Sequence, residues 1–310
     1  MRKLIPSLAL IIAPFVTLKA QTPNFNSQTN WSINKKELRF GLGATQLMGD
    51  LGGSWGVGRP NSLHDWDWQA IRYGANIGYR YRFLPMFATT TSLNFHQLRA
   101  DDKWSEEIMR NKRNLHVRNN AIELSQRFDV IVFWKDKFGS IFNLPGNYSK
   151  KQFSIQVYGF AGLGLMYHNP KAMDQDGNWT ALRPLKTEGQ EKPYSPVTLT
   201  MPMGAGFRWG VGRMWRIGFE ASYVKTFSDY LDDVSTTYTD PANLSSPTAV
   251  YLANPAFPHP SFGPGQQRGN PKWKDAFYHF NLIVTKNLTY KDYGRERSRK
   301  VVSAAGKYRV

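Results

Sequence analysis

No cysteine occurs anywhere in the 310-residue chain. Disulfide bonds therefore cannot stabilise it, which argues against the small, disulfide-linked folds found among exported proteins. Beyond residue 20 the sequence also has no apolar run near the roughly 20 residues that a membrane helix needs, so we expect no helical membrane domain. These absences favour a large hydrogen-bonded framework.

Residues 1–20, MRKLIPSLALIIAPFVTLKA, contain the three parts of a secretory signal peptide. Two cationic residues precede an apolar run from Leu4 to Leu18, and Ala20 stands before Gln21. We expect cleavage after Ala20, an exported mature protein, and a periplasmic N-terminal segment over residues 21–35.

Acidic residues are scarce relative to basic ones, at 23 against 40, which gives a formal charge of +17. Such a charge favours polyanionic partners, such as nucleic acid or an anionic membrane surface. Export argues against nucleic acid. We therefore expect no nucleic-acid partner, and expect outer-membrane lipids or an acidic protein instead.

Residues 215–223, WRIGFEASY, alternate between an apolar, aromatic face and a polar face. A period of two is typical of a β-strand whose two sides lie in different environments. The pattern is clearest in residues 70–83, where Tyr73 and Tyr79 share one face and Asn76 and Arg80 share the other. A scan for this period predicts eight strands, at about 36–47, 70–83, 87–98, 118–132, 152–167, 198–211, 215–226 and 275–288.

The connections between these strands are of two kinds. Those around 84–86 and 212–214 are very short, whereas the first, third, fifth and seventh are long. Tight turns on one side and long loops on the other are typical of bacterial outer-membrane barrels. We therefore predict an all-β fold, an eight-stranded antiparallel transmembrane β-barrel that is OmpA-like. The barrel spans residues 36–288, its long loops are extracellular, its termini are periplasmic, and residues 289–310 form a basic periplasmic tail.

The apolar faces of eight strands would overfill the lumen of a soluble barrel, so we expect them to face lipid. Trp209, Trp215, Tyr81 and Trp134, near strand ends, are expected in interfacial girdles. The charged faces then form a lumen network that plugs the barrel rather than opening a pore. Its predicted members are Arg72, Arg80, Arg82, Glu123, Arg127, Asp129, Arg208, Arg216 and Glu220, with Glu37 and Arg39. Glycines at 162–166 and 204–212 are interpreted as room for lumen side chains.

The strand at 215–226 runs into an aspartate cluster of Asp229, Asp232, Asp233 and Asp240. Calcium binding is one interpretation, but the spacing lacks a regular calcium loop. An acidic surface turn that leaves the membrane is favoured, with Asp232 or Asp233 pairing with a rim or lumen arginine. We expect no metal and no cofactor. The histidines are scattered without diagnostic spacing, so a barrel enzyme is the least favoured class.

Three stretches together resemble the PorG-like outer-membrane β-barrels of the type IX secretion system. They are residues 41–53, GLGATQLMGDLGG; residues 182–210, which include Thr187 to Gln190; and residues 219–238, FEASYVKTFSDYLDDVSTTY. The matching motif residues are Asp229, Tyr230, Leu231, Asp232, Asp233 and Tyr238. The resemblance implies a non-enzymatic barrel that contacts the periplasmic ring formed by a lipoprotein and its partner. The long Pro-rich loop and the basic extension after Leu288 depart from the family pattern.

The fourth connection, residues 135–152, is too long for a tight turn and predicts a structured periplasmic element. Together with the basic tail it supplies the candidate partner contacts, which are Lys135, Lys137, Lys150, Lys151, Arg295, Arg297, Arg299 and Lys300. The alternative function is a small outer-membrane barrel that acts as a binding protein or adhesin through its extracellular loops.

Overall fold

The computed structural model describes residues 31–53, 67–137, 153–211 and 214–289. The predicted signal peptide and basic tail lie outside these ranges, as do Lys150, Lys151, Arg295, Arg297, Arg299 and Lys300. The side chains of Lys135 and Lys137 are also outside the described set, although their backbone belongs to a strand. The division of the chain into signal peptide, barrel and tail therefore stays a prediction.

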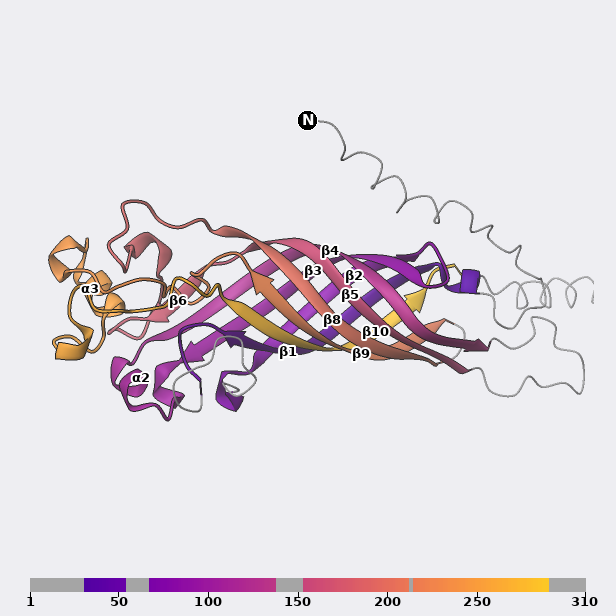
Figure 1. Cartoon of the computed structure of the whole chain (residues 1–310), viewed down its shortest axis with the longest axis horizontal. Coiled ribbons are helices and arrows are strands. Elements are labelled where there is room, and N and C mark those ends of the chain that lie inside the picture. The colour runs from indigo at the N-terminus through magenta and orange to yellow at the C-terminus, as the bar shows by residue number, and fades with distance from the viewer. Residues whose placement is uncertain (1–30, 54–66, 138–152, 212–213, 290–310) are drawn as a thin grey trace, which may run out of the picture.

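Eight long antiparallel strands form the body of the molecule (Figure 1). They are β1 (Lys36–Met48), β2 (Arg72–Arg82), β3 (Phe87–Asp101), β4 (His116–Lys137), β5 (Phe153–Tyr167), β8 (Val197–Val211), β9 (Trp215–Thr226) and β10 (Ala276–Asn287). Two shorter strands, β6 (Pro170–Met173) and β7 (Trp179–Ala181), form a hairpin that extends the sheet beyond β4. The helical elements are η2 (Trp31–Asn34), η4 (Trp68–Ala70), η5 (Asp102–Trp104), α2 (Ile108–Arg113), η6 (Arg183–Leu185), η7 (Pro241–Asn243), α3 (Pro247–Ala253) and η8 (Pro260–Phe262).

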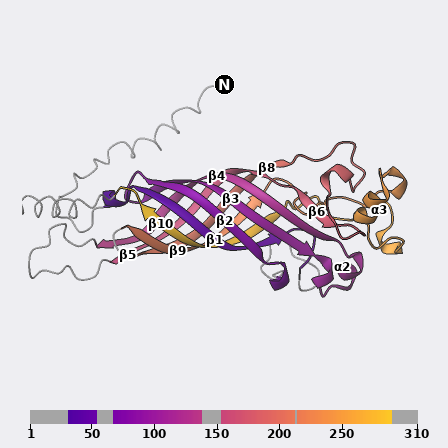
Figure 2. The same cartoon turned by 180° about the vertical axis from the view of Figure 1, so that it is seen from behind.

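The eight long strands close into a barrel. Each pairs with its neighbour along the chain, and closure comes from β1, which pairs with β10 from Glu37↔Asn287 to Met48↔Ala276. A closed sheet gives every interior strand N–H and C=O a partner, which a membrane span requires. The helical elements other than η2 and the described long connections gather at one end, called here the loop end, whereas η2 and the described first and last residues lie at the opposite, terminal end (Figures 1 and 2).

The strand prediction is confirmed for all eight barrel strands. The start of each lies within two residues of the expected position, and the tight turn between β2 and β3 is where it was expected. The main difference is β4, which continues to Lys137 instead of ending near residue 132, so Lys135 and Lys137 belong to a strand and not to a loop. The hairpin of β6 and β7 was not predicted, because three- and four-residue strands carry too little periodic signal.

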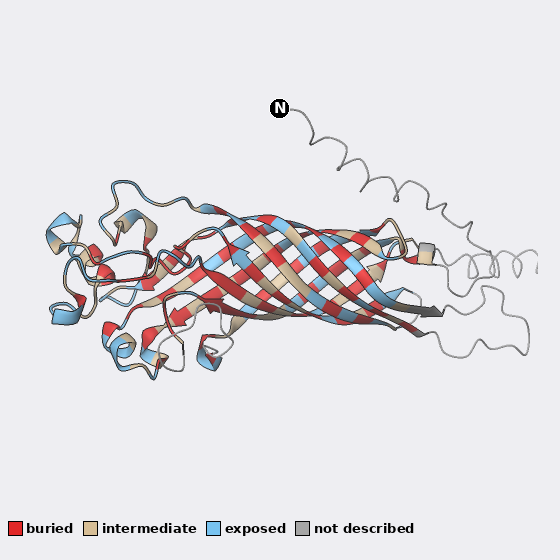
Figure 3. Ribbon diagram, viewed as in Figure 1, coloured by how far each residue is buried: buried red, intermediate tan, exposed pale blue. Residues whose placement is uncertain are grey.

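Burial alternates along the strands, with polar residues inside and apolar residues outside (Figure 3). On β1, Arg39 is 3% exposed, whereas Leu42 is 71% exposed. The exposed apolar set covers the circumference and includes Ile77, Leu93, Leu124, Phe128, Leu163, Leu165, Leu199, Phe207, Phe219 and Leu282. Exposing such a surface is favourable in hydrocarbon and unfavourable in water, so this is a transmembrane barrel. Among the described residues no helix is long and apolar enough to cross a membrane.

Aromatic residues mark the terminal end of the outer surface. Tyr81, Trp209 and Trp215 are 37–43% exposed there, as expected for an interfacial girdle. Trp134 was wrongly assigned to it. A β-bulge between Ile131 and Phe133 inserts one residue into β4 and reverses the alternation, so Trp134 packs inward against the buried cluster of Ile131, Tyr158 and Phe160.

Candidate functional site

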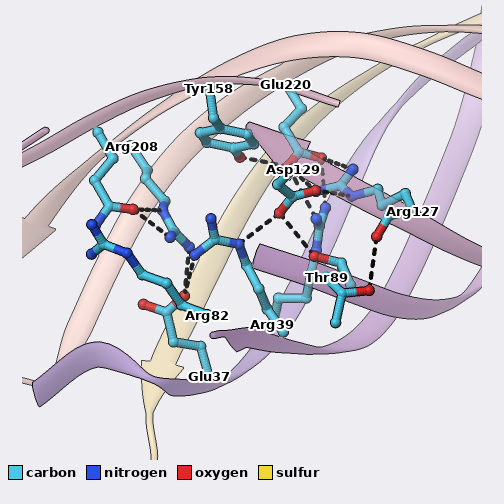
Figure 4. Close-up of polar contacts among 12 residues, drawn as sticks. Glu37, Arg39, Arg82, Thr89, Arg127, Asp129, Tyr158, Arg208 and Glu220 are labelled. Carbon is cyan, nitrogen blue, oxygen red and sulfur yellow. Dashed lines mark hydrogen bonds and ion pairs between the residues drawn. The ribbon is translucent and has the colours of Figure 1, made fainter. Parts of the chain in front are cut away.

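The lumen of the barrel contains a continuous network of arginines and carboxylates (Figure 4). Glu37 of β1 is one centre. It accepts hydrogen bonds from Arg80 of β2 at 3.1 Å, Arg208 of β8 at 2.8 Å and Arg216 of β9 at 2.8 Å. Three arginines on one carboxylate would repel one another without its charge, so Glu37 links β1 electrostatically to three other strands.

Glu220 of β9 is the second centre. Arg39 reaches its two oxygens at 3.0 and 2.6 Å, and Arg127 does the same from the opposite wall at 3.0 and 2.6 Å. The Tyr158 hydroxyl donates to the same carboxylate at 2.5 Å. These fork-to-carboxylate pairs are the strong, directional form of an ion pair. Glu220 therefore ties together β1, β4, β5 and β9 across the lumen.

Asp129 of β4 joins the two centres. Its Oδ2 accepts from Arg80 Nε at 2.6 Å and from the Thr90 hydroxyl at 2.9 Å, and its Oδ1 lies 3.1 Å from Arg127 Nε. Arg80 also binds Glu37, and Arg127 also binds Glu220, so the chain of ion pairs crosses the whole lumen. The network plugs this part of the barrel.

Glycines make room for these side chains, as predicted. A Cβ at Gly164 would stand 2.5 Å from Thr200 Oγ1 and 2.9 Å from Glu123 Oε1, and one at Gly206 would stand 2.7 Å from Glu220 Cγ. The remaining space near Glu123 and Glu220 is a polar cavity of about 20 Å³, room for about one water molecule. Within the described residues, the lumen is therefore filled by side chains.

Eight of the nine predicted network residues lie in the interior. Glu123 lies nearer the loop end and accepts from Thr200 at 2.5 Å and from Asn94 at 3.1 Å. Arg82 is fully buried and donates to the Pro85 carbonyl. Arg72 was wrongly assigned, because it is the first residue of β2 and stands at the rim. Its guanidinium donates to the carbonyls of Gln69 and Ile71 and lies outside the ion-pair network.

Several lumen residues were not predicted. Tyr158 was missed because aromatic residues were assigned to the lipid side, although it shares a face with the polar Gln156, which binds Arg208 at 2.5 Å. His96 was set aside as scattered. His96 shares the inward face of β3 with Asn94 and Ser92. Their spacing of two residues was the signal that could have placed His96 in the lumen.

Loops from four parts of the chain interlock at the other end of the lumen. We call this the loop-end cap and define it as residues 49–53, 102–115, 182–194 and 227–275. It encloses an apolar core that includes Leu51, Leu115, Leu182, Leu231 and Val234, all at most 5% exposed. Two regions therefore block the lumen: the ion-pair network in the middle of the barrel and the apolar core under the loop-end cap.

Two arginines of the cap clamp loops together. Arg113 binds both oxygens of Asp102 at 2.7 and 2.8 Å and donates to the carbonyls of Asp50 and Arg268 at 2.9 and 3.0 Å. Arg268 binds Glu188 at 3.0 Å and also donates to the Asp233 carbonyl. Four loops meet through these two side chains, and neither arginine was predicted, because several of their partners lie in other loops.

The predicted acidic surface turn is wrong for three of its four aspartates, since Asp240 alone is exposed. Asp229, Asp232 and Asp233 are 2%, 1% and 0% exposed, because they are the internal acceptors of the cap. Asp232 accepts the backbone N–H of Asp50, Leu51 and Val234 at 2.8, 3.2 and 3.0 Å. Asp233 accepts from the hydroxyls of Thr187 at 2.5 Å and Tyr194 at 2.7 Å.

The expected arginine partner of this cluster is also corrected. Asp233 lies 3.5 Å from Arg268, which belongs to the same long connection and not to the rim or lumen. The remaining motif residues also have structural positions: Leu231 and Tyr238 are buried, and Tyr230 stacks on Tyr194 with ring centroids 4.5 Å apart. The motif builds the cap.

Burial changes the acidity of the cap carboxyls. It raises the pKa of Asp229 and of Asp233 to about 6, against the opposing effects of Lys274 and Arg268 respectively. Burial also raises the pKa of Asp232 and of Asp275 well above the usual value, and a nearby carboxylate adds to each effect, Asp50 for Asp232 and Asp232 for Asp275. Among the described residues no group of three or more His, Asp or Glu side chains could hold a metal ion. Backbone N–H groups donate to Asp232 and Asp275, whereas side-chain hydroxyl groups donate to Asp229 and Asp233.

Comparison with known proteins gives structural similarity without a family. No protein-family model and no curated protein matches the chain. Among solved structures, Neisserial surface protein A is matched with a TM-score of 0.36 at 9% identity, over 82% of this chain and 97% of that one. Ail, the attachment invasion locus protein of Yersinia pestis, is matched with a TM-score of 0.31 at 12% identity, over 81% and 97%. The N-terminal β-barrel domain of Pseudomonas aeruginosa OprF is matched with a TM-score of 0.30 at 11% identity, over 82% and 98%.

Proposed function

We propose that this chain is a non-conducting, non-enzymatic outer-membrane barrel that serves as a membrane-embedded attachment point. The observation that carries the proposal is the lumen network centred on Glu37 and Glu220. Side chains that bind one another this closely leave no path for ions or solutes. A protein without a pore acts through the surfaces that it presents at the two ends of the barrel.

Planar lipid bilayers test the plugged barrel directly. The purified protein is expected to insert without single-channel current steps, because the lumen is filled. A protein-free detergent solution is the control for membrane leakage. Regular, voltage-dependent steps from the wild-type protein would overturn the proposal and make the barrel a channel.

The finer role that we propose is a component of the type IX secretion system, which positions a periplasmic lipoprotein-containing ring from the terminal end. The support is the resemblance of residues 41–53, 182–210 and 219–238 to the PorG-like barrels. Crosslinking followed by mass spectrometry on outer membranes tests it. Links from residues 135–152, or from the chain after Leu288, to a periplasmic lipoprotein are expected, and links confined to the loop end would contradict the role.

A specific observation favours a second candidate, a binding protein or adhesin that acts through the loop-end cap. The cap is rigidly built, with Arg268 only 3% exposed between ion-pair partners from different loops. A preorganised surface loses little conformational entropy when it binds. Deleting residues 241–262, which hold η7, α3 and η8, should abolish surface binding in this case and leave ring association intact.

A further inference from the structure

Three cations stand side by side on the outer surface of the barrel near the loop end. Arg99 of β3 lies directly opposite Arg118 of β4, and Arg118 lies directly opposite Lys171 of β6. All three point outward, because the residues on either side of each in the chain are buried and the three themselves are partly exposed. Like charges directly opposite each other on neighbouring strands are destabilising, so this cation row is unfavourable unless an anion lies across it.

The protein supplies little negative charge to the row. Among the described residues, one carboxylate is within ion-pair distance, that of Asp101 at 3.9 Å from Arg99. Arg72 adds a fourth cation near Arg99, since both guanidinium groups lie over the ring of Trp104. The cation row therefore keeps a net positive charge, and the outer surface between it and the middle of the barrel carries few other charges.

Two tryptophans hold the arginines of the row. The Cζ atom of Arg99 is 4.7 Å from the ring centroid of Trp104, and that of Arg118 is 4.0 Å from the ring centroid of Trp179. Contact with an aromatic face orients a guanidinium group and leaves its N–H edge available. Tryptophan is also enriched at the boundary between membrane and water.

The height of the row matches the headgroup region of a bilayer. Below it on the outer surface, Gln97 pairs with Asn120, and the next outward row is the apolar Phe95, Ile122 and Tyr167. Arg99 and Arg118 thus stand two residues further along their strands than the first polar pair, Gln97 and Asn120. For strands tilted by about 40° this is roughly 5 Å further along the barrel axis.

We propose that Arg99, Arg118 and Lys171 bind the phosphate headgroup of an anionic membrane lipid in the leaflet at the loop end. Arginine forks match phosphate oxygens in pairs, and bound phosphate would neutralise the cross-strand repulsion. The acyl chains would lie against the apolar surface around Ile122 and Tyr167. The inference rests on the barrel's lying in a bilayer, and it is independent of the secretion role.

Lipid retention by the full-length protein, purified in detergent, tests the site. Native mass spectrometry would count bound phosphatidylglycerol against bound phosphatidylcholine. We expect the wild type to prefer phosphatidylglycerol and the triple variant R99Q/R118Q/K171Q to lose about tenfold or more of that preference. The charge-matched control K112Q/K192Q/K272Q removes three exposed loop-end cations outside the row and should keep the preference.

The variant Arg118→Glu separates lipid binding from folding. A glutamate between Arg99 and Lys171 relieves the repulsion, so this variant should fold normally, as judged by its heat-dependent gel shift, yet lose the lipid preference. An unchanged preference in R99Q/R118Q/K171Q, or an equal loss in the control, would overturn the proposal. Inorganic phosphate that displaces the lipid at equal concentration would assign the row to soluble phosphate. Failure of the wild type to fold in lipid would instead count against the proposed function.

Discussion

The lumen network and the loop-end cap both bury charge, and they do so in opposite ways. The described lumen has more arginines than carboxylates, and the partners come from strands on opposite walls, as in the pairing of Glu220 with Arg39 and Arg127. The cap has more carboxylates than arginines, and its acids accept backbone N–H groups, as Asp232 does from three residues. Strands fix side chains across a lumen, whereas irregular loops leave backbone donors that buried acids satisfy.

This difference predicts two modes of failure. Loss of a lumen carboxylate exposes arginines to one another inside the membrane and should weaken the barrel itself. Loss of a cap contact should open the loops and leave the barrel folded.

Glu220→Ala should have the largest effect. It leaves Arg39 and Arg127 buried without their shared carboxylate and removes the acceptor of Tyr158, and breaking a buried ion pair costs about 3–5 kcal/mol. Urea unfolding in lipid vesicles, followed by the heat-dependent gel shift, measures the loss. Tyr158→Phe is the matched control, since it removes one hydrogen bond and keeps both ion pairs. Equal effects of the two variants would contradict the role of Glu220 as a centre.

Arg113→Ala should act on the cap alone. The variant removes the ion pair with Asp102 and the donors to the carbonyls of Asp50 and Arg268, and hydrogen bonds to charged groups contribute about 1.5–3 kcal/mol each. We expect faster limited proteolysis within residues 227–275 and an unchanged gel shift of the barrel. Lys112→Ala, at the exposed neighbouring position, serves as the control. A barrel destabilised as much as the cap would show that the two regions are one unit.

Gly162→Ala tests the lumen packing at a backbone contact. Its Cβ would stand 2.4 Å from the Gln126 carbonyl oxygen and 2.6 Å from Arg127 Cα, atoms that cannot move without shifting β4. Overpacking of this kind costs about 1–3 kcal/mol. Gly159→Ala on the same strand is the control, because its nearest atom is 3.8 Å away. The idea fails if the two variants unfold at the same urea concentration.

A change in pH should have the smallest effect and should appear in the cap. Burial raises the pKa of Asp229 and Asp233 to about 6, above the value of about 3.9 in an unfolded chain. Between these values the folded cap binds protons that the opened loops release, so its stability is greatest below about pH 4 and falls as the pH rises through 6.

Amide hydrogen exchange, corrected for the intrinsic rates, measures this dependence. Protection within residues 227–275 should be several-fold lower at pH 7 than at pH 5, and protection in the barrel strands should not change. Asp229→Asn should flatten the part of the dependence that this group supplies. Protection that rises with pH would contradict the sign derived from the raised pKa values.

Much of the barrel could be predicted from residues alone, and much of the cap could not. In β2, and in β9 as far as Tyr223, one face carries polar side chains or glycine and the other carries apolar side chains, so strand existence, span and inside-outside assignment follow from the period. The same logic placed Arg80, Arg127 and Glu220 inside. It failed at Trp134, where a β-bulge changes the alternation, and at Arg72, which stands at a strand end.

What the sequence determined by itself is the alternation, which makes the chain an eight-stranded barrel with charge inside and apolar groups outside. The tertiary structure decided which charges meet. Glu37 collects arginines from three strands, and the aspartates expected to face water became buried acceptors of the cap, because loops distant in the chain fold over them. A local pattern specifies which face a residue occupies, and only the closed barrel specifies what lies opposite it.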